Sequence, residues 1–195
     1  MKCLIIWISS LVLIGVILDV CYGAEIEDET SKIQKTIVHL LSKGLPKHKI
    51  KPWPRHPLLK DTSQLLELSS AINAASQAKD VPPALLIATG FREGSFKPGS
   101  EGDLGELSMF QMMPATAREA QLLEPRCTLD TVEGSAMCSA TWLRHWADKC
   151  GNWRGSLAIY ATGKSCNPKH NERVEWLTAD RLGIAKKLHK RFWAN

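Results

Sequence analysis

The stretch GELSMFQMMPATA, residues 105–117, decides how the rest of the chain is interpreted. It contains a run of large apolar side chains that includes Met109, Phe110, Met112 and Met113. Upstream, Glu93 ends an apolar helical pattern and is flanked by Phe91 and Phe96. The sequence therefore predicts apolar surroundings for the Glu93 carboxyl.

Glu93 is the first candidate for chemistry. Burial in an apolar pocket raises the pKa of a glutamic acid, which keeps its proton available near neutral pH for transfer to a glycosidic oxygen. The alternative is an ordinary glutamate at a helix end, paired with Arg92 or solvated. Position alone favours this alternative.

Three motifs, in a fixed order along the chain, instead favour a chemical role for Glu93. Residues 105–117 resemble a segment of the soluble lytic transglycosylase (SLT) family: a glycine turn, a small residue, two apolar residues, Gln, two more residues, Pro, a variable residue and Thr-Ala. Glu93–Pro98 resembles the family's catalytic glutamate with its following aromatic residue and proline, and Ala158–Gly163 resembles its Ala-x-Tyr-Asn-x-Gly. The resemblance spans roughly residues 65–185 and implies a mainly helical, lysozyme-like domain.

The resemblance also implies roles for single residues. Glu93 corresponds to the catalytic acid/base, and the implied substrate contacts are Gln111, Met113, Tyr160, Ser108 and Phe110. No cofactor and no metal are implied. The sequence departs from the family pattern at four places, which puts substrate detail in doubt more than catalysis: Ala161 for Asn, Ser108 for a common Gly, Gly102 for a common Ser, and Gly94 for the Ser after the glutamate.

The reaction implied is cleavage of the β-1,4 bond between N-acetylmuramic acid and N-acetylglucosamine in peptidoglycan, with a 1,6-anhydro-muramoyl product. Two alternatives stay open. Asp103, in the loop between the first two motifs, could position a water as in goose-type lysozymes and make the protein a hydrolase. The fold could also serve as a non-catalytic module for wall binding or assembly.

Apolar periodicity predicts helices along most of the chain. A short helix over 31–43 has Ser31 and Gln34 as its capping box, and a helix of about 18 residues starts after Asp61. Further helices are expected from Asp80 to Glu93, from Asp130 to near Gly151, over 152–161 and at the C-terminus. The proline-rich stretch between the first two helices should run extended.

With 195 residues, of which 44% are hydrophobic, the chain can bury one core. Residues 1–23 read as a signal peptide, so the protein is expected to be exported to the periplasm or cell envelope. An uncleaved anchor helix and a lipid on Cys21 are alternatives. Residues 24–60 are interpreted as an N-terminal extension and 61–195 as the catalytic domain.

Four cysteines follow the predicted leader: Cys127, Cys138, Cys150 and Cys166. An even set fits two disulfides in an oxidising compartment. Of the three pairings, the one that joins Cys138 to Cys150 fits worst, because a helix between them would separate them by roughly 18 Å. We favour Cys127 with Cys138 and Cys150 with Cys166. A zinc site is the competing interpretation, but no two of these cysteines have the two-to-four-residue spacing of zinc ligands.

The formal net charge of +5 favours anionic polymers as partners without choosing among them. The resemblance implies peptidoglycan glycan strands as the partner of a monomer, with no nucleic acid, and with membrane contact only through an uncleaved leader. Many small SLT-type proteins open the wall for a secretion, conjugation, pilus or phage machine, and the length of this chain fits such a local role.

Overall fold

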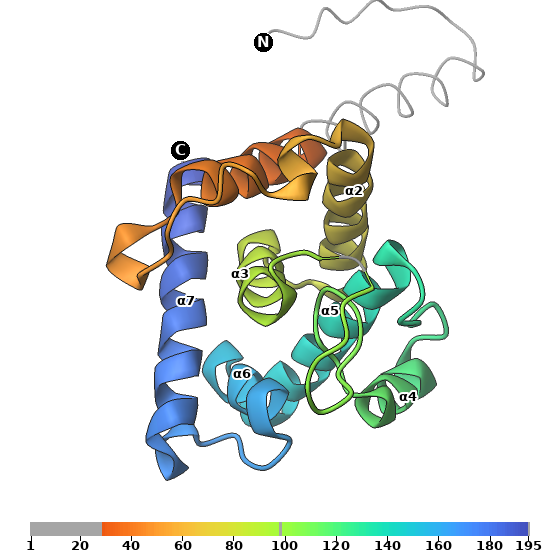
Figure 1. The fold of residues 1–195 in the computed structure, drawn as a ribbon. Coiled ribbons are helices and arrows are strands. Elements are labelled where there is room, and N and C mark those ends of the chain that lie inside the picture. Colours follow the sequence, from red (N-terminus) through yellow and green to blue (C-terminus); the bar gives the residue numbers. More distant parts are fainter. Residues whose placement is uncertain (1–28, 98, 195) are drawn as a thin grey trace, which may run out of the picture.

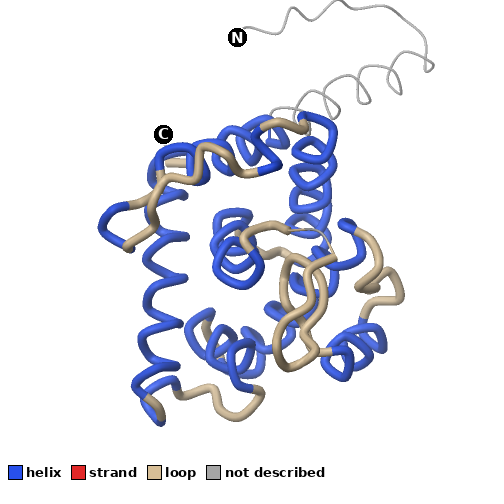
Figure 2. Tube along the Cα trace, viewed as in Figure 1, coloured by secondary structure: helices blue, strands red, loops and turns tan. Residues whose placement is uncertain are grey.

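The computed structural model describes residues 29–97 and 99–194, and these residues are mainly helical, as predicted (Figures 1 and 2). No strand occurs among them; three isolated β-bridges are present. The predicted leader over residues 1–23 lies outside the described residues. The elements are a helix that includes residues 29–43, then η1 (Pro46–His48), η2 (Pro57–Leu59), α2 (Thr62–Lys79), α3 (Pro83–Gly94), α4 (Pro114–Leu123), α5 (Val132–Cys150), α6 (Trp153–Thr162), η3 (Pro168–His170) and α7 (Glu172–Phe192).

Side-chain caps explain where the helices begin. The Asp61 carboxylate accepts a hydrogen bond from the backbone N–H of Gln64 at 2.9 Å, as predicted for α2. At α5 the cap is Thr131 rather than Asp130, and its hydroxyl oxygen accepts from the N–H of Gly134 at 3.0 Å. Asp80 does not open α3. It ends α2 in the left-handed conformation, with φ of 49°.

Two further boundaries correct the sequence analysis. The first helix already includes residues 29 and 30, so Ser31 is not its cap. Helix α4 was not predicted, because its only buried side chains are the small Ala117 and Ala120, which give a weak apolar period. Its start is nevertheless visible in the sequence, since Pro114 occupies the first helical turn.

The hydrophobic core lies between α2, α3, α5, α6 and α7. Helix α5 packs against α2 and α6, and α3 packs against α7 (Figure 1). The helix over 29–43 lies across the C-terminal end of α7 and buries Ile33, Ile37, Leu40 and Leu41 almost completely. Burial of one such side chain stabilises a fold by roughly 1.5–3 kcal/mol. This N-terminal helix is therefore part of the same core.

The proline-rich segment over 44–60 is a strap on this core rather than a wholly extended chain, because it contains the 3-10 turns η1 and η2. The backbone N–H of Trp53 donates to the carbonyl of Leu41 at 2.6 Å. His56 Nε2 lies 2.8 Å from the carbonyl of Ser95, and His56 Nδ1 accepts from the N–H of Leu58. The strap is thereby attached to the loop that follows α3.

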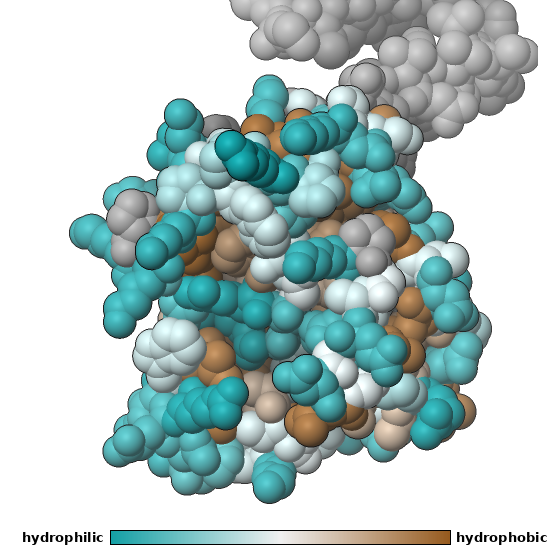
Figure 3. Space-filling model, viewed as in Figure 1, coloured by the Kyte–Doolittle hydropathy of each residue, from teal (hydrophilic) through white to brown (hydrophobic). Residues whose placement is uncertain are grey.

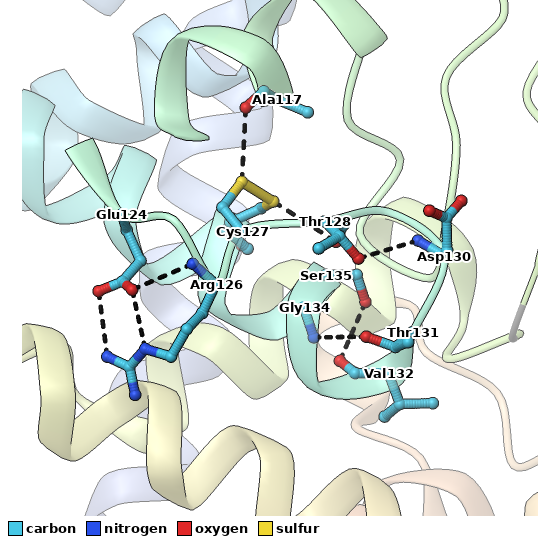
Figure 4. The surroundings of a disulfide bond; sticks show 12 residues. Ala117, Glu124, Arg126, Cys127, Thr128, Asp130, Thr131, Val132, Gly134 and Ser135 are labelled. Carbon is cyan, nitrogen blue, oxygen red and sulfur yellow. Dashed lines mark hydrogen bonds and ion pairs between the residues drawn. A yellow bond between two sulfur atoms is a disulfide. The ribbon is translucent and has the colours of Figure 1, made fainter. Parts of the chain in front are cut away.

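Two disulfides join Cys127 to Cys138 and Cys150 to Cys166, the favoured pairing. All four cysteines are thus used, which leaves the zinc alternative without thiolate ligands. Figure 4 shows the first disulfide beside the start of α5, next to a pair formed by Glu124 and Arg126. Among residues 29–97 and 99–194, no helix is long and apolar enough to cross a membrane.

Candidate active site

A long loop joins α3 to α4 (Figure 2). Leu104, Glu106 and Gln111 of this loop line a cavity, so the loop forms one wall of the candidate site. It is fixed by backbone hydrogen bonds between Leu107 and Met112, at 2.9 and 3.0 Å, and by the burial of Phe96 and Phe110. Gly90 makes this packing possible, because a Cβ there would lie 2.9 Å from the Phe110 ring. The apolar run predicted to surround Glu93 is therefore also what anchors the loop.

Glu93 lies in the last turn of α3 and lines a cavity of about 820 Å³. Its side chain is 19% exposed. Burial raises the pKa of the Glu93 carboxyl; the charge and hydrogen bond of Arg181 oppose the rise, and the negative charge of Glu106 adds to it. The predicted shift toward a proton-holding carboxyl is thus present, although a counter-ion limits it.

Tyr160 lies on α6 and lines the same cavity. Its hydroxyl donates to the carbonyl of Phe110 at 2.9 Å and lies 3.2 Å from Ser139 Oγ. Burial, and then the charge of Glu93, raise the pKa of the Tyr160 phenol well above its usual range. The phenol therefore stays protonated and fixes the loop against α6.

Gln111 also lines the cavity, and it has a left-handed backbone with φ of 48°. Its side-chain amide donates to the carbonyl of Ser108 at 2.8 Å and to Ser100 Oγ at 3.0 Å. Gln111 therefore closes the loop on itself at the edge of the groove.

The other predicted contacts separate into two groups. Met113 is 42% exposed and lines the cavity, as a substrate contact requires. The side chains of Ser108 and Phe110 are buried and do not line it. The structure gives these two residues a place in the loop's support: Ser108 Oγ accepts from the N–H of Phe110 at 3.3 Å.

The two acidic residues Asp103 and Glu106 of the loop differ in their position relative to the cavity. Asp103 is exposed and does not line the cavity, whereas Glu106 lines it. The Glu106 carboxylate is held by the N–H of Leu104 at 3.0 Å, and the carbonyl of Glu106 accepts from the N–H of Gly102 at 2.7 Å. Glu106 is thus the acid that the turn directs toward Glu93.

The most important residue that the sequence analysis missed is Arg181 on α7, which is 3% exposed and forms an ion pair with Glu93. The residue before it on α7, Asp180, pairs with Arg92, the residue before Glu93 on α3. Nothing in the sequence distinguishes Arg181 from the surface cations of the same helix.

The face of the molecule drawn in Figure 3 is mostly hydrophilic, with separate hydrophobic patches. Exposed apolar side chains on the described surface include Leu104 and Met113, and both of them line the cavity. The arrangement combines a carboxyl whose pKa is raised by burial, polar walls and apolar contact points. Such a groove suits a polymer with both hydroxyl-bearing edges and apolar faces.

The sequence model of one protein family, the transglycosylase SLT domain, matches residues 70–182 of this chain. This span is more than half of the chain and includes Glu93, Gln111, Tyr160 and Arg181. It excludes the helix over 29–43 and the strap over 44–60. A comparison with curated proteins found no match.

Proposed function

Because this chain belongs to the transglycosylase SLT family, whose members are lytic transglycosylases of peptidoglycan, we propose that it cleaves the β-1,4 bond between N-acetylmuramic acid and N-acetylglucosamine and leaves a 1,6-anhydro-muramoyl product. The observation that carries this proposal is the Glu93 carboxyl. It lines the groove, and burial raises its pKa, as a proton donor to a glycosidic oxygen requires.

Glu93 acts twice in the proposed reaction. It first donates its proton to the oxygen of the leaving N-acetylglucosamine, while the N-acetyl group of the muramoyl sugar assists at the anomeric carbon. The resulting carboxylate then accepts the proton of the muramoyl 6-hydroxyl as that oxygen closes the anhydro ring. The proton count of Glu93 is restored, and no water is consumed.

The other residues of the groove support this cycle from fixed positions. Tyr160 and Gln111 hold the loop wall beside Glu93, and Met113 offers an exposed apolar contact for a sugar face. A site that needs one carboxyl must hold it accurately, since a misplacement of about 1 Å costs roughly a hundredfold in rate.

A hydrolase is the second candidate function, and the position of Glu106 is the observation that favours it. Glu106 lines the cavity and its charge acts on Glu93, so it could activate a water as a second carboxylate. The exposed position of Asp103 makes it the weaker candidate for that role.

Mass spectrometry of the muropeptides released from purified peptidoglycan separates these functions. We expect 1,6-anhydro products from the wild-type protein, their loss in Glu93→Gln, and their retention in Glu119→Gln, which changes an exposed glutamate on α4. Reducing-end products that disappear in Glu106→Gln would establish hydrolysis instead. Release by neither pathway would favour the non-catalytic wall-binding or assembly module.

We also propose that the protein works in the periplasm or cell envelope, where its substrate is found and where the two disulfides would be stable. Fractionation of producing cells, with thiol labelling before and after reduction, tests this location. Recovery in the reducing cytoplasm with Cys127, Cys138, Cys150 and Cys166 as free thiols would contradict it. Local wall opening for an envelope machine is compatible with this location and rests on the family resemblance alone.

A further inference from the structure

Two consecutive residues of α3 pair with two consecutive residues of α7. Arg92 Nε lies 2.6 Å from Asp180 Oδ2, and Glu93 forms an ion pair with Arg181. The order of charges is reversed on the two helices, so each pair also fixes the register of the other. The candidate catalytic carboxyl is therefore held by a residue outside the three motifs that identified it.

The two arginines are held in different ways. Arg92 forms an ion pair with Asp180 through Nε, which makes no hydrogen bond of acceptable geometry, and its Nη2 donates to the carbonyl of His48 at 2.8 Å. Arg181 pairs with Glu93 through Nη2, while its buried Nε and Nη1 have no hydrogen-bond partner within the described part of the chain. A buried donor without a hydrogen-bond partner lowers the free energy of unfolding, because it has lost its contact with water. Arg181, which borders the groove, thus has two buried donor nitrogens without acceptors.

Charged and titratable groups act on Glu93 from α7, from the loop wall and from α6, and Arg173 of α7 also lines the cavity. Arg181 approaches from α7, Glu106 from the loop wall and Tyr160 from α6. Arg92, on the same helix as Glu93, is already paired with Asp180. Only Arg181 among these groups brings a positive charge into contact with the carboxyl.

We propose that Arg181 is a positioning residue for Glu93: it holds the carboxyl in the empty groove, and an incoming glycan takes over the guanidinium before Glu93 transfers its proton. Sugar hydroxyl and acetamide oxygens are the acceptors that Arg181 lacks. This inference rests on the proposed function. It adds one step before the reaction, in which Glu93 and Arg181 separate. If the Glu93 carboxyl was ionised in the pair, it takes one proton from the solvent at this point.

The pH dependence of kcat/KM tests the pairing. Glu93 must be protonated to act as an acid, so activity falls as the pH rises through its pKa. Arg181→Gln removes the charge that opposes the effect of burial, and we expect the high-pH limb to move upward by about one to three pH units, with a lower kcat. Arg181→Lys keeps the charge and should leave the limb near its wild-type position.

Arg154→Gln is the matched control, because Arg154 forms an exposed pair with Glu175 between α6 and α7 and does not line the cavity. It should leave the limb unchanged. An unmoved limb in Arg181→Gln, or an equal movement in Arg181→Lys, would overturn the role of Arg181. Thermal melting of each variant shows whether it is folded.

A titration that needs no turnover separates this inference from the proposed function. Carboxyl carbons of ¹³C-labelled glutamate are followed by NMR, and the Glu93 signal is assigned by its loss in Glu93→Gln. We expect a higher Glu93 pKa in Arg181→Gln than in the wild type. We also expect a rise in the wild-type pKa when a tetramer of β-1,4-linked N-acetylglucosamine binds.

The same Glu93 pKa in wild type and Arg181→Gln would refute the pairing. A bound tetramer that leaves the wild-type pKa unchanged would refute the exchange of partners. If the tetramer does not bind, the free-protein comparison decides the pairing, and a tenfold or greater increase in KM for peptidoglycan in Arg181→Gln decides the exchange. A protein with these shifts but no muropeptide release would contradict the proposed function and leave the role of Arg181 intact.

Discussion

His48 Nδ1 lies 3.0 Å from Oδ1 of Asp180, although 132 residues separate the two in sequence. The contact ties the strap over 44–60 to the helix that carries Arg181. Gly183 provides the space, since a Cβ there would lie 2.5 Å from His48 Cε1. The strap precedes the span matched by the family model, yet it supports the ion pairs behind the candidate site.

Replacement of His48 by alanine should destabilise the fold by about 1.5–3 kcal/mol, because Asp180 is nearly buried and loses a hydrogen-bonding partner. Chemical denaturation measures the free energy of unfolding. His170→Ala, at an exposed position on η3, is the control and should change it by less than about 0.5 kcal/mol. If both variants lose the same free energy of unfolding, the contact between His48 and Asp180 does not stabilise the fold.

Tyr160→Phe should cost about 1–3 kcal/mol, because the buried carbonyl of Phe110 loses its donor. Ser139→Ala removes only the second partner of the hydroxyl and should cost less. We also expect slower muropeptide release from Tyr160→Phe, since the loop wall beside Glu93 loses its anchor on α6. If Ser139→Ala proves the more damaging change in both assays, the anchor lies elsewhere.

Sequence reasoning reached the fold because caps and apolar periods are local. Asp61 and Gln64 mark the start of α2 in the sequence, and the same hydrogen bond is found in the structure. Helix α4 escaped because two small alanines make a poor apolar stripe. Asp80 was misplaced because an aspartate before a proline pair suits a helix start as well as a left-handed helix end.

The site was less accessible to sequence reasoning, since it depends on directions of side chains. The three motifs drew attention to Glu93, Gln111 and Tyr160, and all three residues line one cavity in the structure. Arg181 comes from 88 residues away, and only the packing of α3 on α7 makes it a partner of Glu93. Glu106 rather than Asp103 lines the cavity because the turn between Gly102 and Glu106 sets which carboxylate points inward.

The stability of the protein should depend on pH through Glu124. Arg126 and then Lys79 hold the pKa of this carboxyl well below its usual range, with Lys79 Nζ 2.6 Å from Oε2. A carboxyl whose pKa is depressed in the folded state contributes stability above its unfolded pKa, about 4.3, and loses it as the pH falls.

Glu124→Gln should therefore melt at a lower temperature than the wild type at pH 7, and the difference should shrink between about pH 5 and pH 2. Lys79→Met, which removes one partner, should show the same trend with a smaller amplitude. A difference that is constant across this range would mean that the charge of Glu124 is not what stabilises the end of α4.

Gly94 is the residue after Glu93 and stands where the family pattern has serine. A Cβ at this position would lie 2.7 Å from the carbonyl oxygen of Met109, so α3 and the loop wall approach each other more closely here than a side chain allows. Gly94→Ala and Gly94→Ser both add that Cβ, and each should destabilise the protein by about 1–3 kcal/mol.

Both variants should also release muropeptides more slowly, because the displaced Met109 backbone belongs to the wall that surrounds Glu93. Denaturation and product release are measured on the same preparations. If the alanine variant is impaired and the serine variant is not, the hydroxyl has gained a hydrogen bond that offsets the crowding, and the glycine is a neutral departure. Impairment of both would mean that the loop wall lies closer to α3 in this chain than the family pattern allows, and that this close approach requires a glycine at position 94.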